Sequence, residues 1–187
     1  EGSFAFNEQR LGTEDDSQDN CEGVCLVLEY CSNSDLRQLL KRKDRLTDEE
    51  AKIYLRGVLE GLEYLHSKNV VHRDVKLANV LLDDKHRAKL CDFGVAASIE
   101  EGERWTLCGT PNYVAPEIVN GETAHGTAVD LWAVGCVIGE MYLGRPIFPG
   151  KDTQEQLQLV EEPCFDYLHE EPACRAKSLV AKLLRHD

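Results

Sequence analysis

The segment from His72 to Asn79 carries side chains that could transfer a phosphoryl group. It reads His-Arg-Asp-Val-Lys-Leu-Ala-Asn, which places Asp74, Lys76 and Asn79 in one short stretch. A carboxylate can orient an attacking hydroxyl and accept its proton, and an ammonium can neutralise a moving phosphate. An amide oxygen can bind a magnesium ion. The spacing therefore predicts that these three side chains converge on one reaction centre.

A second candidate magnesium ligand follows eighteen residues after Asp74, in Asp92-Phe93-Gly94. Carboxylate oxygens are hard ligands of the kind that Mg²⁺ prefers, and Gly94 gives the backbone freedom to turn Asp92 inward. Each motif is weak alone. Together with Ala115-Pro116-Glu117 they fix eleven letters in order, and chance agreement is about 10⁻¹⁴ per register.

Helices flank these motifs on both sides. A first helix is predicted from Ser34-Asp35 to about Asp44, and a longer one follows the capping box Thr47-Asp48-Glu49-Glu50 and ends near 67–69. A nearly all-round apolar helix over 129–143 should be buried centrally. Ala176, Leu179, Val180, Leu183 and Leu184 form a last amphipathic stripe.

Short strands should position the chemistry between the helices. From residue 70 the spacing of apolar residues changes from the helical period of about 3.6 to the strand period of 2. This predicts short strands at 70–71, 80–82 and 88–91, around the turn residues Asp83-Asp84. Before the first helix, strands are expected over 3–6 and 24–29. The acidic stretch 8–23 between them has no apolar periodicity and indicates a long loop.

Composition excludes several classes of function. The chain has 187 residues and a formal net charge of −13, which repels a nucleic-acid backbone. Its apolar runs are far shorter than the ~20 residues that cross a bilayer. No secretory signal opens the chain, so we expect an intracellular location, cytoplasmic or nuclear, and no membrane association. The eight cysteines lack zinc-ligand spacing and are interpreted as reduced thiols.

The order of the motifs resembles the protein kinase family over about 4–187. Lys76, two residues after Asp74, is similar to the serine/threonine-specific form. Segment 102–113 most closely resembles polo-like kinases, although 105–111 also resembles cyclic-AMP-dependent kinase. Segment 144–152 resembles the mitogen-activated and cyclin-dependent groups, so the subfamily stays open.

The resemblance implies an α+β fold, with a mostly helical C-terminal lobe and only a remnant of the N-terminal β lobe. Residues 1–187 would form a single partial kinase domain. Of these, 1–30 would be the N-lobe remnant and the start of the hinge, and 31–187 a C-lobe truncated before its last helices. No Gly-x-Gly-x-x-Gly and no Val-Ala-x-Lys occur, and residue 1 is Glu. We therefore expect the chain to be an excerpt of a longer product.

The resemblance also implies the catalytic roles. Asp74 would be the base, Lys76 the γ-phosphate contact, and Asn79 and Asp92 the magnesium ligands. Thr110 would help to position the acceptor hydroxyl. The nucleotide would be contacted by a larger set: Leu28, Glu29 to Cys31 through their backbone, Asp35 and Leu81.

Supporting roles follow from the same resemblance. Asp130 would brace the catalytic segment, and His72 and Phe93 would pack as internal supports. Thr106 would be an activating phosphosite, with the guanidinium of Arg73 available to pair with its phosphate. Cys91 would face the nucleotide site, where packing is the favoured role.

The function implied is that of a serine/threonine protein kinase fragment, which transfers the ATP γ-phosphate to protein substrates with ATP and Mg²⁺ as cofactors. The alternative is a pseudokinase-like scaffold or regulatory protein that lacks the ATP lid. Four intact residues, Asp74, Lys76, Asn79 and Asp92, favour the catalytic interpretation. We expect the fragment alone to be inactive. Substrate identity and oligomeric state cannot be predicted from the sequence.

Overall fold

A computed structural model describes residues 26–99, 110–121, 126–161 and 174–185. The chain divides into two units, residues 1–30 and 31–187. In the first unit, residues 26–30 form neither helix nor strand, and Leu28 is 73% exposed. The strand predicted over 24–29 is therefore wrong for its described part, because no described strand pairs with it. The strand predicted over 3–6 and the loop over 8–23 lie outside the described residues.

Two capped helices begin the second unit, as predicted. Helix α1 (Leu36–Lys43) starts after Asp35, whose side chain accepts a hydrogen bond from the backbone N–H of Gln38. Helix α2 (Asp48–Ser67) starts with the predicted capping box, in which Thr47 and Glu50 satisfy each other's backbone N–H groups. The buried residues of the two helices are Leu36, Leu39 and Leu40, and Ala51, Tyr54, Val58 and Leu62.

Two small antiparallel sheets hold the motif segments. Strand β2 (Val80–Leu82) follows the 3₁₀ turn η1 (Leu77–Asn79) and pairs with β3 (Ala88–Leu90), with Val80 opposite Leu90. Strand β1 (Val70–Val71) pairs with β4 (Ala97–Ser98). Segment 72–79 leads from β1 to β2, and segment 91–96 leads from β3 to β4. The sheets therefore bring both motifs to one place.

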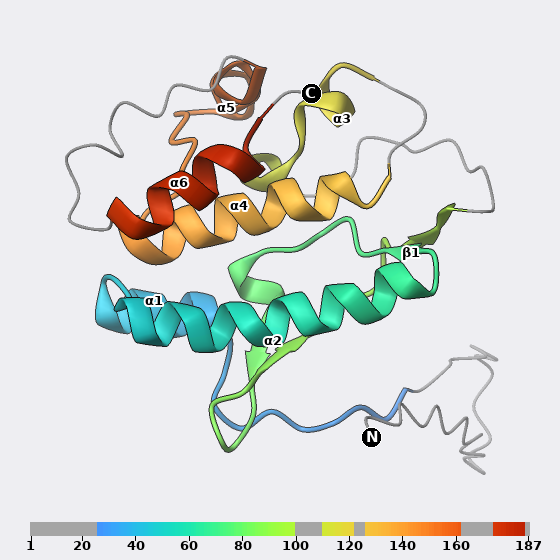
Figure 1. The fold of residues 1–187 in the computed structure, drawn as a ribbon, viewed down its shortest axis with the longest axis vertical. Helices are drawn as coiled ribbons and strands as arrows, with labels where there is room; N and C mark the ends of the chain where they lie inside the picture. The colour runs from blue at the N-terminus through green and yellow to red at the C-terminus, as the bar shows by residue number, and fades with distance from the viewer. Residues whose placement is uncertain (1–25, 100–109, 122–125, 162–173, 186–187) are drawn as a thin grey trace, which may run out of the picture. The chain divides into compact units, whose positions relative to one another are not determined.

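Helix α4 (Ala128–Leu143) is buried on nearly all sides, as the sequence predicts. It packs against α2 and α6 (Cys174–Leu183), and Figure 1 shows it in orange between them. It ends at Gly144, which has a φ of 71°, and a Cβ at this position would overlap the carbonyl oxygen of Asp44. Only glycine fits there. The end of α4 is thereby tied to the end of α1.

Two short helices and a 3₁₀ turn pack together near α4. The turn η3 (Pro111–Tyr113) and helix α3 (Pro116–Val119) contain the Thr110 and Ala-Pro-Glu regions. Helix α5 (Thr153–Glu161) was not predicted, although its start is capped. Asp152 accepts a hydrogen bond from the backbone N–H of Glu155. The carboxylate of Glu155 in turn accepts one from the backbone N–H of Lys151.

The buried apolar core extends from Leu36 to Leu184, within the second unit. Trp132 of α4 stacks on Phe148 with 5.9 Å between the ring centroids. Strand residues Val71, Val80 and Leu82 are fully buried in the same core. The described part thus has the predicted mostly helical fold with short strands. Among its helices, none combines the length and apolarity needed to span a membrane.

Candidate active site

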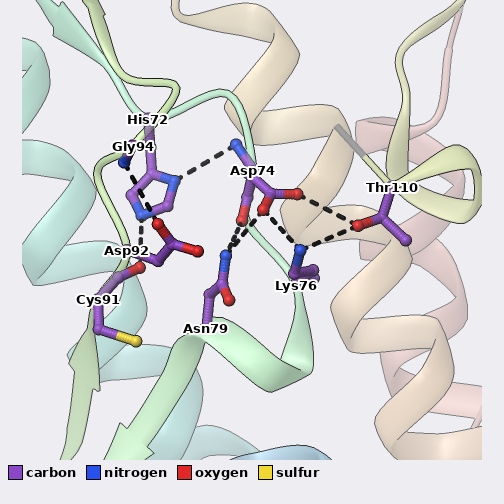
Figure 2. A network of polar contacts seen from close by, with 8 residues as sticks. All are labelled: His72, Asp74, Lys76, Asn79, Cys91, Asp92, Gly94 and Thr110. Carbon is purple, nitrogen blue, oxygen red and sulfur yellow. Dashed lines mark hydrogen bonds and ion pairs between the residues drawn. The ribbon is translucent and has the colours of Figure 1, made fainter. Parts of the chain in front are cut away.

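The carboxylate of Asp74 lies at the centre of a hydrogen-bonded network (Figure 2). Lys76 Nζ donates to Asp74 Oδ2 at 2.6 Å, and Asn79 Nδ2 donates to the same oxygen at 3.0 Å. The Thr110 hydroxyl donates to Asp74 Oδ1 at 3.3 Å and accepts from Lys76 Nζ at 3.0 Å. The structure therefore brings together four residues that the sequence places in the reaction centre.

A buried carboxylate on α4 holds the turn before Asp74. Asp130 is fully buried, and its Oδ2 and Oδ1 accept hydrogen bonds from the backbone N–H groups of His72 and Arg73, both at 2.9 Å. Arg73 has a φ of 65°, a left-handed conformation that costs a non-glycine residue about 1–2 kcal/mol. The two bonds offset this cost, and Asp130 occupies the bracing position expected from the sequence.

His66 is a member of this network that the sequence analysis missed. Its Nε2 lies 2.8 Å from Asp130 Oδ2. It stands four residues after Leu62, which itself follows Val58 by four, so it continues the buried stripe of α2. A histidine in an otherwise apolar stripe was the available signal, because a polar group at such a position requires a buried partner.

His72 connects the catalytic segment to the Asp92 segment. Its Nδ1 accepts a hydrogen bond from the backbone N–H of Asp74 at 3.3 Å, which places the ring proton on Nε2. Nε2 then donates to the carbonyl of Cys91 at 3.1 Å. The ring of Phe93 lies 5.2 Å from that of His72. Phe93 is nevertheless 45% exposed, so the prediction of an internal support is correct for His72 and only half correct for Phe93.

Two oxygen atoms in the site suit a magnesium ion. Asn79 uses its amide nitrogen for the Asp74 carbonyl and carboxylate, which directs its amide oxygen away from Asp74 (Figure 2). Asp92 has a φ of 64°, and its Oδ1 accepts from the backbone N–H of Gly94 at 3.3 Å. Neither Asn79 Oδ1 nor Asp92 Oδ2 accepts a hydrogen bond from a described residue. Mg²⁺ commonly uses one or two such protein ligands and completes its shell with phosphates and water.

Three of the residues predicted to contact the nucleotide, Cys31, Asp35 and Leu81, belong to the same unit as Cys91. Asp35 forms an isolated antiparallel bridge with Leu81. Burial raises the pKa of Cys91, and the nearby charges of Asp92, Cys31 and Asp35 raise it further. Cys31, Asp35 and Leu81 therefore gather near the Asp92 segment. Leu28 and Glu29 belong to the first unit, and their roles stay predictions.

The raised pKa of Cys91 also bears on its reactivity. A thiol is nucleophilic as the thiolate, and burial disfavours that form. Together with the hydrogen bond from the Cys91 backbone N–H to the carbonyl of Asn79, at 3.0 Å, this favours a packing role.

A small pocket adjoins Asp74 on the side of Thr110 and η3. Its lining includes Arg73, Thr110, Tyr113 and Ile118. Behind it, the Tyr113 hydroxyl donates to the Glu140 carboxylate of α4. Burial raises the pKa of both groups, and the charge of Arg37 opposes the shift at Glu140.

The predicted phosphosite Thr106 lies outside the described residues. Its predicted partner Arg73 donates from Nε to the carbonyl of Val95 at 2.5 Å. This bond joins the catalytic segment to the start of the segment that contains Thr106. The pairing of Arg73 with a phosphate stays a prediction.

Comparison with known proteins supplies independent information. The family described as "Protein kinase domain" matches residues 14–187. Probable serine/threonine-protein kinase CCRP1 of Zea mays is 43% identical over 169 residues, which cover 89% of this chain and 27% of that protein. Serine/threonine-protein kinase PLK2 of Mus musculus is 39% identical over 165 residues, covering 87% and 24%.

A third relative has a similar identity and coverage. Serine/threonine-protein kinase PLK1 of Xenopus laevis is 40% identical over 167 residues, which cover 88% of this chain and 27% of that protein. The chain thus spans about a quarter of the length of these relatives.

Proposed function

Because the chain belongs to the protein kinase family, we propose that the protein containing it transfers the γ-phosphate of ATP to serine or threonine hydroxyls of protein substrates. The observation that supports this most directly is the network in which Asp74 meets Lys76, Asn79 and Thr110. Phosphoryl transfer uses a base, a cation and oxygen ligands for magnesium, and here the base contacts the cation and the amide nitrogen of Asn79, whose oxygen is left for a metal. Residues 31–187 would correspond to the C-lobe of the kinase domain.

The two oxygens of Asp74 would have different tasks. Oδ2 is held by Lys76 and Asn79, which fixes the orientation of the carboxylate. Oδ1 accepts only the longer bond from Thr110 among the described residues. It is therefore the oxygen that would accept the proton of the attacking hydroxyl. Lys76, which already reaches both Asp74 and Thr110, would contact the transferred phosphate.

Asn79 Oδ1 and Asp92 Oδ2 would be ligands of magnesium. Bound Mg²⁺ neutralises charge on the phosphates and orients them for in-line transfer. Asp130 and His72 act at a distance from the reaction, because they keep the Asp74 and Asp92 segments in a fixed relation. ATP, Mg²⁺ and protein substrates are thus the proposed cofactors and partners.

Transfer of radiolabelled phosphate from ATP to a general protein substrate tests the proposal, with the complete protein and its Asp74→Asn and Asp92→Asn variants. Losing the placed base Asp74 costs about 10²–10⁴-fold, and losing the ligand Asp92 removes the charge stabilisation that the metal supplies. Each variant should therefore lose detectable transfer while its thermal unfolding stays close to that of the wild type. Transfer that survives both substitutions contradicts the site assignment. A complete protein that folds and transfers no phosphate would instead support the scaffold alternative.

A further inference from the structure

One residue of α1, Gln38, contacts both oxygens of the Asp35 carboxylate. The backbone N–H of Gln38 donates to Asp35 Oδ1 at 2.8 Å, and its side-chain Nε2 donates to Oδ2, also at 2.8 Å. The first bond is the helix cap, which any residue except proline would supply. The second requires a donor on a side chain three residues along the helix. Gln38 therefore fixes the orientation of this carboxylate in a way that is specific to its side chain.

Both oxygens of Asp35 keep acceptor capacity after these bonds. An ionised carboxylate has about four lone-pair sites. Each oxygen of Asp35 accepts one described hydrogen bond, so each can accept another. Two neighbouring acceptors held at a fixed separation match the two neighbouring hydroxyls of a cis-diol, such as the 2′- and 3′-hydroxyls of ribose.

The carboxylate belongs to the group of residues predicted to contact the nucleotide. The backbone of Asp35 bridges to Leu81 of β2, and Leu81 pairs with Lys89 of β3, three residues before Asp92. A sugar bound by Asp35 would thus lie near the segment that carries the candidate magnesium ligands. Gln38 itself is exposed, and it contacts the site through Asp35.

We propose that Gln38 is a positioning residue for sugar recognition, which holds the Asp35 carboxylate so that both oxygens accept hydrogen bonds from a ribose diol. The inference rests on the proposed function, because it takes the ligand to be a ribonucleotide. It predicts that Gln38 sets discrimination between ATP and 2′-deoxy-ATP, which has lost one of the two hydroxyls. It also predicts that Gln38 affects nucleotide affinity and leaves the chemical step unchanged.

Calorimetric binding of ATP and of 2′-deoxy-ATP, each with Mg²⁺, to the complete protein tests this. In Gln38→Ala the helix cap remains, because the backbone N–H is unchanged. The dissociation constant for ATP should rise about threefold to tenfold, which corresponds to losing about one ordinary hydrogen bond between the misaligned carboxylate and the diol. The constant for 2′-deoxy-ATP should change less, so the preference for ATP should shrink. The near-isosteric Gln38→Glu replaces the donor by a carboxylate and should weaken the preference at least as much.

The matched control is Arg42→Ala, which changes an exposed residue of the same helix and should leave both constants unchanged. Circular dichroism should show equal helix content in all three variants. A wild-type protein that binds the two nucleotides equally, or a Gln38→Ala variant that keeps the wild-type preference, overturns the inference. Phosphate transfer is measured in parallel. If binding follows Gln38 and no transfer occurs, the inference stands and the proposed catalytic function fails.

Discussion

At the residue scale, Thr110 contacts both the proposed base, Asp74, and the proposed phosphate contact, Lys76. Its hydroxyl accepts from Lys76 and donates to Asp74. In Thr110→Val the shape remains and both bonds are lost, so kcat for phosphate transfer should fall about tenfold. Thr110→Ser keeps the hydroxyl and should retain most of the rate. Steady-state kinetics compare the two variants, and equal rates in Val and Ser would show that the hydroxyl has no part in positioning.

Thr106 provides a second prediction at this scale. It lies in the 26-residue stretch from Asp92 to Glu117, and a phosphate there would be paired by Arg73, the neighbour of the base. Thr106→Ala should therefore lower the activity of the complete protein, and Arg73→Lys should lower it as well, because lysine lacks the bidentate fork. Mass spectrometry of active protein should find Thr106 phosphorylated. Unmodified Thr106 in fully active protein, with full activity in Thr106→Ala, contradicts this prediction.

The sequence predicted contacts well where spacing alone determines them. Asp74, Lys76 and Asn79 share one short segment, and Thr110 was identified from the resemblance to a family. His66 and Gln38 were missed for different reasons. The bond of His66 to Asp130 crosses 64 positions and depends on how α2 packs against α4. The bond of Gln38 to Asp35 is local, and the spacing of an acid and an amide three residues apart would have allowed its prediction.

At the element scale, helix boundaries followed from capping chemistry. Asp35 and the Thr47–Glu50 box mark the starts of α1 and α2, and both were predicted from these residues. The start of α5 has a comparable Asp152–Glu155 pair, so that helix was predictable and was overlooked. Strand β4 was not predictable in this way. It has two residues, and its pairing with β1 depends on contacts that no local pattern encodes.

The contact between η3 and α4 predicts a pH dependence of stability. Burial raises the pKa of Glu140 above its ordinary value of 4.5, although the hydrogen bond from Tyr113 and the charge of Arg37 oppose this. The folded state then holds the Glu140 proton at pH values where the unfolded state has released it. Glu140 therefore contributes stability that is present at low pH and is lost as the pH rises through the raised pKa.

Glu140→Gln tests this contribution, because the amide keeps an acceptor for Tyr113 and cannot ionise. Urea titrations give the free energy of unfolding at pH 5 and at pH 8. Between pH 5 and pH 8, Glu140→Gln should lose less stability than the wild type, or gain more. Tyr113→Phe removes the donor to a buried carboxylate and should destabilise the protein by about 1–3 kcal/mol at pH 8. A Glu140→Gln variant with the pH profile of the wild type would show that Glu140 does not titrate differently on folding.

At the scale of the whole molecule, the apolar core and the candidate active site belong to the same unit. The core residues run from Leu36 to Leu184, and every described contact of Asp74 is made within this range. In the other unit, Leu26, Val27, Leu28 and Tyr30 are 62–86% exposed. Exposed apolar residues of this kind promote association. Removing residues 1–30 should therefore leave the thermal unfolding temperature nearly unchanged and reduce aggregation.

The 187 residues as a polypeptide should bind Mg-ATP poorly. Among the described residues, the proposed contacts to the triphosphate are Lys76 and the metal that Asn79 and Asp92 would hold, and the sequence contains no glycine-rich phosphate loop and no Val-Ala-x-Lys motif. In kinases such parts cover the phosphates and pair with them. A thermal-shift titration with Mg-ATP should accordingly show no saturable shift at micromolar nucleotide, whereas the complete protein should show one. A saturable shift for the monomeric 187-residue polypeptide would contradict this prediction, because it would mean that these 187 residues hold the nucleotide without a glycine-rich loop to cover it.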